Sequence, residues 1–110
     1  MTAELVRLRQ SYGVGFLRYL SRRDELTLHT AYELGRCGLA AGVSPLDLVQ
    51  IHHAVLVVAL TDAGAGDLRD IADAAAAFLA EVLGPFEMTR RALLDRAGEG
   101  AAASPRRRPS

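Results

Sequence analysis

Two adjacent histidines are the residues of this chain best suited to chemistry. His52 and His53 are neighbours in sequence, and neighbours on a helix point about 100° apart. They therefore do not form the i, i+4 pair that helical zinc sites use. Two interpretations remain: one histidine hydrogen-bonded inside the protein with the other half-exposed, or a metal site. The spacing favours the first interpretation.

The other candidate groups also fail to assemble a catalytic site. Cys37 has no histidine near it in the sequence, and a cysteine of this kind usually packs as a small apolar residue. Asp67, Asp70 and Asp73 are typical of a solvated first helical turn that complements the helix dipole, rather than of a metal cluster. No nucleophile, base and oxyanion-stabilising group come together. We therefore predict a non-enzyme with no catalytic residues, no cofactor and no metal.

The composition indicates one domain that does not span a membrane. Half of the 110 residues are apolar, which excludes wholesale disorder and suits a modest core. Uninterrupted apolar runs reach seven residues, as over residues 54–60, whereas a membrane span needs roughly 20. The first ten residues show no secretory signal. The single cysteine cannot form an internal disulfide, so we expect a cytoplasmic protein.

The spacing of apolar residues, three to four positions apart, predicts four helices. These cover residues 3–21, 24–41, 45–61 and 67–96. Pro85 lies inside the fourth and removes one backbone donor, so we expect a kink in the turn before it. No strand-like alternation and no internal repeat are apparent. The fold class is therefore predicted to be all-α, a four-helix bundle-like domain.

The last residues differ in composition from the rest. Residues 98–110 read GEGAAASPRRRPS, a low-complexity segment that we expect to be a disordered tail after a helical domain of residues 1–97. The tail holds Arg106–Arg108, which leaves ten arginines against 13 acidic residues in residues 1–103, a formal charge of −3. A slightly acidic body argues against a nucleic-acid-binding surface on the fold.

The turn between the second and third predicted helices carries the strongest local signals. Gly42 stands where a helix end favours a residue free to adopt positive φ. Ser44 then supplies an N-cap hydroxyl, and Pro45 occupies the first helical position, where no N–H is needed. Asp47 follows in the first turn, facing the positive end of the helix dipole.

The third predicted helix is apolar on nearly all sides, which is typical of a helix inside a larger assembly. Two apolar stripes can be drawn on it, and only Asp47, Gln50 and Ala54 form a clearly polar face. One small bundle buries a single stripe, so the second stripe predicts an interface. We therefore expect a homodimer whose contacts and core include Leu48, Val55 and Val58.

Four segments of the chain match a known pattern: SYGVGFLRYL, AYELGR, SPLDLVQIHHAVL and EVLGPFEMTRRAL, together within about residues 5–95. In these segments the chain resembles the N-terminal domain of the stress-response phosphatase RsbU. The SPLDLVQIHH turn and helix is the most specific part, and PFEM supports it. The resemblance implies an all-α domain that dimerises through its helices, similar also to the C-terminal domain of the clock protein KaiA.

The resemblance also implies a function. In RsbU this domain is not catalytic; it docks the switch kinase RsbT, which activates a phosphatase domain that follows in the same chain. This sequence departs from RsbU after Arg96, where only the predicted tail follows, so the phosphatase activity is not expected to carry over. The positions implied to contact an RsbT-like serine kinase are Ile51, His52, Leu56, Phe86, Glu87 and Met88.

The function predicted is thus a non-catalytic interaction module of a bacterial partner-switching pathway. The alternative is a small helical regulator of a sensor kinase or transcription complex that uses the same surface but is unrelated to stress signalling. A neighbouring gene pair for a kinase and its antagonist would favour the first hypothesis.

Overall fold

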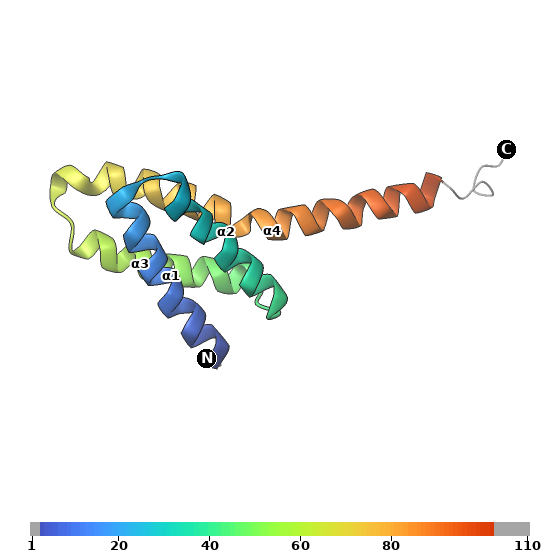
Figure 1. Cartoon of the computed structure of the whole chain (residues 1–110), viewed down its shortest axis with the longest axis horizontal. Helices are drawn as coiled ribbons and strands as arrows, with labels where there is room; N and C mark the ends of the chain where they lie inside the picture. Colours follow the sequence, from blue (N-terminus) through green and yellow to red (C-terminus); the bar gives the residue numbers. More distant parts are fainter. Residues whose placement is uncertain (1–2, 103–110) are drawn as a thin grey trace.

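The computed structural model describes residues 3–102, and within that range it is all-α, with no strand (Figure 1). Its helices are α1 (Ala3–Arg22), α2 (Glu25–Ala40), α3 (Pro45–Thr61) and α4 (Leu68–Ala102). A short 3-10 turn, η1 (Ala65–Asp67), comes directly before α4. The prediction of four helices is therefore confirmed. None of the helices in the described range is long and apolar enough to span a membrane.

The predicted turn between α2 and α3 is confirmed in detail. Gly42 has a φ of 80°, the left-handed conformation that costs glycine least. Ser44 Oγ accepts a hydrogen bond from the backbone N–H of Asp47 at 3.1 Å, and the Asp47 carboxylate accepts from the Ser44 N–H at 3.5 Å. Pro45 occupies the first turn of the helix. These reciprocal bonds fix where α3 begins.

The fourth helix is longer than predicted. The apolar spacing ends near Arg96, yet α4 continues to Ala102. The alanines around Gly98 and Gly100 are strong helix formers, and a helical glycine costs only about 1 kcal/mol. Pro85 does not end the helix either, and Figure 1 shows the axis of α4 changing direction beside α2. The rest of the predicted tail, residues 103–110, lies outside the described residues.

The backbones of α2 and α4 meet at Gly35. A Cβ atom added there would overlap the carbonyl oxygen of Val82 and would lie 3.2 Å from Cδ of Pro85. The hydrogen that takes the place of a side chain on Gly35 therefore points at that carbonyl. Only glycine permits so close an approach, which sets how α2 crosses α4.

Aromatic residues of α1 form the centre of the core around Phe78 of α4. Tyr12 and Phe16 meet the Phe78 ring edge to face, with ring centroids 5.2 and 5.4 Å apart. All three side chains are almost completely buried. Edge-to-face pairs add about 0.5–1.5 kcal/mol beyond the area they bury. This cluster joins the first and last helices of the chain.

A buried hydrogen bond joins α1 to α3. The hydroxyl of Tyr12 and Nδ1 of His52 are 2.7 Å apart. Burial raises the pKa of Tyr12, so the phenol stays protonated, and we assign it as the donor to a neutral imidazole. Burial, and secondly the nearby His53, lower the pKa of His52. Both pKa shifts favour the same state, in which Nδ1 of the neutral His52 accepts the hydrogen bond from the Tyr12 hydroxyl.

Only one of the two predicted stripes of α3 faces the core. Leu48 and Ile51 of that stripe are buried, as is the neighbouring His52, whereas Val58 at the end of the same stripe is exposed. Besides the predicted polar residues Asp47, Gln50 and Ala54, apolar side chains of α3 also meet solvent in the single chain. These are Leu46, Val49, Val57, Val58 and Leu60. One layer of helices covers one side of α3 and leaves the other side open.

We expect Gly35→Ala to lower the free energy of unfolding by about 1–3 kcal/mol. Forcing a methyl group against a backbone carbonyl costs more than the roughly 1 kcal/mol that alanine contributes to a helix. Gly38→Ala is the matched control, because a Cβ at Gly38 would make only ordinary contacts of 3.6–3.8 Å. Urea melts of both variants test this, and equal stabilities would contradict the close crossing.

We expect Ser44→Ala to cost about 1 kcal/mol through loss of its bond to the Asp47 N–H. The measurement is the urea midpoint at unchanged slope. Ser21→Ala, an exposed change inside α1, is the control and should leave the midpoint in place. An unchanged midpoint for Ser44→Ala would mean that the capping box contributes nothing to stability.

Stability should fall as the pH drops below about 6.5, the ordinary histidine pKa. Because the folded state lowers the pKa of His52, the unfolded state takes up the proton first. The stability that neutral His52 contributes is fully present above pH 6.5. It is lost as the pH falls toward the lower pKa that His52 has in the folded state. His52→Gln should be less stable at neutral pH and should lose this slope, whereas exposed His53→Gln should keep most of it. Urea melts of the wild type and of both variants between about pH 5 and 8 measure this pH dependence.

Candidate functional site

The three predicted contact residues on α3 are not on one surface. Ile51 is 4% exposed and His52 is 8% exposed, and both side chains belong to the core. Leu56 is half-buried and packs against the edge of that core. Ile51 and His52 therefore cannot meet a partner unless the bundle opens. The prediction that they belong to a docking surface does not fit their burial, which follows from the single core-facing stripe of α3.

The three predicted contact residues on α4 are more accessible. Phe86 is half-buried against the core, whereas Glu87 and Met88 are exposed. The Glu87 carboxylate pairs with Arg90 at 3.3 Å and with Arg91 at 3.1 Å, one turn further along the helix. Ion pairs this exposed contribute little to stability, so Glu87 is free to serve a partner.

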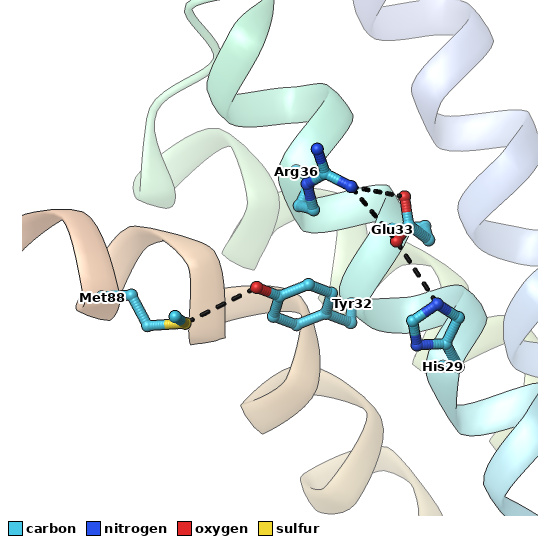
Figure 2. A network of polar contacts seen from close by, with 5 residues as sticks. All are labelled: His29, Tyr32, Glu33, Arg36 and Met88. Carbon is cyan, nitrogen blue, oxygen red and sulfur yellow. Dashed lines mark hydrogen bonds and ion pairs between the residues drawn. The ribbon is translucent and has the colours of Figure 1, made fainter.

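Met88 lies beside a polar network on α2 that the sequence did not reveal as a site (Figure 2). The Tyr32 hydroxyl donates to the Met88 sulfur at 3.5 Å, and the His29 ring stacks on Tyr32 with centroids 6.1 Å apart. Glu33 bridges His29 and Arg36, each at 3.3 Å. We call these five residues the α2–α4 face. Tyr32 has the helical spacing of an apolar core residue, so only its hydroxyl and its polar neighbours could have indicated a surface site.

Two shallow hollows flank the α2–α4 face. One of about 350 Å³ is lined by Tyr32, Arg36, Pro85 and Met88, among others. The other, of about 440 Å³, lies between the end of α2, the start of α3 and α4, and includes Phe86 and Glu87 in its lining. Because α2 crosses α4 here, the predicted contact residues Phe86, Glu87 and Met88 lie beside the polar network on α2.

A larger apolar groove lies on a different part of the molecule, between α1 and α3. Its volume is about 560 Å³, and Val14, Leu17, Val55 and Val58 are among its lining residues. We call it the α1–α3 groove. Of the three residues predicted for the core or the dimer, Val55 and Val58 line this groove, whereas Leu48 is fully buried in the core.

The side chains gathered on the α2–α4 face are of types that occur often in protein interfaces. Among residues 3–102, no three histidine, cysteine, aspartate or glutamate side chains come close enough together to hold a metal ion. His52 is engaged by Tyr12 in the core, and Cys37 is exposed. Tyrosine, arginine and methionine, which meet on the α2–α4 face, are enriched in protein interfaces.

Residues 10–89 match the family model described as the phosphoserine phosphatase RsbU, N-terminal domain. The matched region includes most of α1, all of α2 and α3, and α4 as far as the α2–α4 face. Comparisons with curated proteins and with solved structures give no significant match. Because the match covers more than half of the chain, the protein belongs to the family of the RsbU N-terminal domain.

Proposed function

We propose that this chain is a non-catalytic docking module of a bacterial partner-switching pathway and binds an RsbT-like serine kinase in the cytoplasm. The observation that carries the proposal is the family match over residues 10–89, which concerns the N-terminal domain of the phosphatase. A regulatory module of a partner-switching pathway is consistent with that match. Within residues 3–102, the exposed α2–α4 face offers a surface for such docking.

The α2–α4 face is the docking surface in this proposal. Met88 is 60% exposed, and the neighbouring Glu87 carries its charge on the rim of the adjacent hollow. Interface hot spots favour tyrosine and arginine, and both line the hollow here as Tyr32 and Arg36. Tyr32 contacts Met88 and His29, and Arg36 pairs with Glu33, so both side chains have contacts before binding, which reduces the entropy lost on docking.

Self-association is the second part of the proposal. The α1–α3 groove and the α2–α4 face are lined by different residues, so a homodimer formed through the groove leaves the docking face open. One dimer could then hold two kinase molecules. This separation makes the two parts of the proposal independently testable.

We expect Glu87→Arg to weaken binding of an RsbT-like kinase from the same genome at least tenfold, which equals about 1.4 kcal/mol. The substitution reverses a charge in the hollow beside the docking surface and places a third cation beside Arg90 and Arg91. The thermal midpoint should change little, since the carboxylate is exposed. Titration calorimetry with purified kinase measures the affinity.

Glu99→Arg is the matched control, because it makes the same charge reversal at an exposed site further along α4. Its affinity for the kinase should equal that of the wild type. If the wild-type protein binds no such kinase, the docking function is refuted. Binding instead to a sensor kinase or a transcription complex would establish the alternative regulator.

A further inference from the structure

We propose that the α1–α3 groove binds a medium-chain fatty acid, with the carboxylate at Arg9 and the alkyl chain along the apolar walls toward Leu17 and Val58. The volume of about 560 Å³ lies within the roughly 300–1,000 Å³ that small-molecule sites span. Such sites are mostly apolar and carry a few polar groups that orient the ligand. The groove has this composition, because Arg9 and Gln10 are the only charged or amide side chains among its lining residues in the described part of the chain.

The polar and the apolar parts of the groove lie toward opposite ends. A second hollow shares Arg9 and Ala54 with the groove and thereby marks the Arg9 end. Leu17 comes about two turns after Arg9 on α1, and Val58 comes one turn after Ala54 on α3, so both lie toward the other end. About 12 Å separates Arg9 from Leu17 along the axis of α1. This polarity matches a ligand with one charged end and one medium-length alkyl chain.

Arg9 is available for an anionic head group. No ion pair within residues 3–102 involves Arg9. A guanidinium group matches a carboxylate with two parallel N–H···O bonds. Asp47 lines the second hollow, but its carboxylate accepts a hydrogen bond from the Ser44 N–H at the start of α3. The unpaired charge beside the groove is therefore positive, and the complementary head group is negative.

The apolar end of the groove is open to solvent in the single chain. Val14, Leu17 and Val58 are 52, 56 and 60% exposed on its walls. Gly13 leaves a depression between the helices, where the site of its missing Cβ is 3.9 Å from the Val55 side chain. An alkyl chain that lies in this depression covers the apolar walls, and each methylene group removed from water favours binding.

The number of cations distinguishes this site from a membrane-binding surface. Surfaces that bind anionic lipids carry clusters of roughly 4–8 lysines or arginines, whereas one arginine is found among the described residues that line the groove. Acidic residues also outnumber arginines over residues 1–103. One carboxylate needs only one cation, so the charges favour a single fatty-acid molecule over the surface of a bilayer.

The ligand also regulates the self-association proposed above, and on this point the inference rests on that proposal. A second copy that pairs through the groove needs the side chains that the alkyl chain covers, including Leu17 and Val58. The ligand and the second copy therefore exclude each other, and the fatty acid shifts the equilibrium toward the single chain. The α2–α4 face is lined by other residues, so kinase docking is unaffected.

Titration calorimetry of the full chain with submicellar octanoate tests the head-group contact. Octanoate should bind at least tenfold more tightly than 1-octanol, which has the same chain length and no charge. Octyltrimethylammonium, with the opposite charge, should bind no more tightly than 1-octanol. Arg9→Gln should remove the preference for octanoate and leave the affinity for 1-octanol unchanged. Arg7→Gln is the matched control, because Arg7 is exposed on α1 and lines a different hollow.

Two results of this titration would overturn the contact with Arg9. One is equal affinity of the wild type for octanoate and octyltrimethylammonium. The other is an Arg9→Gln variant that keeps the full preference for octanoate. Sedimentation of the wild type with phosphatidylglycerol vesicles, lost in Arg9→Gln, would assign the groove to a membrane surface and overturn the fatty-acid site.

Gly13→Leu tests the position of the alkyl chain. A Cβ at Gly13 makes only an ordinary contact, so the variant should fold, while its longer side chain fills the depression. Binding of octanoate and of 1-octanol should weaken at least tenfold. Gly98→Leu is the matched control, because Gly98 is exposed on α4 with open space around it. Far-UV circular dichroism verifies that both variants are folded, and undiminished binding by Gly13→Leu would overturn the inference.

Sedimentation equilibrium at micromolar protein concentration separates this inference from the proposed function. Saturating octanoate should raise the dimer dissociation constant of the wild type at least tenfold. A dimer that octanoate leaves intact would overturn the shared use of the groove. A wild type that is monomeric without ligand would overturn the regulatory part together with self-association, and the calorimetric comparisons would still decide the fatty-acid site. Kinase binding, measured separately, decides the docking proposal.

Discussion

The contact between the backbones of α2 and α4 at Gly35 is the constraint on which the rest of the structure depends. Because Gly35 has no side chain, α2 lies directly against the Val82 carbonyl and beside Pro85. Tyr32, one turn earlier on α2, consequently reaches Met88, one turn after Pro85 on α4. A larger residue at position 35 would push the helices apart and would separate the two halves of the α2–α4 face.

The same close packing leaves the outer sides of α1 and α3 uncovered. α4 fills the space between the other helices with Phe78 and Val82, and its C-terminal part runs beyond them as an exposed rod (Figure 1). No further helix among the described residues lies over the α1–α3 groove. A domain of this size buries only part of its apolar surface on folding, and association with a second copy is a common solution.

The polar groups fall into two classes with different roles. The Tyr12–His52 hydrogen bond is buried, so losing it leaves an unsatisfied group in the core and affects stability. The ion pairs of Glu33 and Glu87 are exposed and contribute little to folding, so a partner can engage these residues at low cost. If docking occurs at the proposed surface, binding and stability depend on different residues, and variants can separate them.

The sequence by itself determined the local structure. The helix spacing, the Gly42–Ser44–Asp47 turn and the family segments were all readable, because capping and periodicity act between residues a few positions apart. It did not determine the end of α4 near Ala102, since alanine and glycine carry no clear stop signal.

Only the tertiary structure decided which apolar or polar residues of each helix meet solvent. Ile51 and His52 share a motif with exposed neighbours, yet they lie in the core because α1 and α4 cover that side of α3. Tyr32 has the spacing of a core residue, yet it reaches the surface beside Met88. These outcomes depend on how closely helices distant in sequence approach, and that distance is set by side-chain volume at the crossing points rather than by any pattern along one helix.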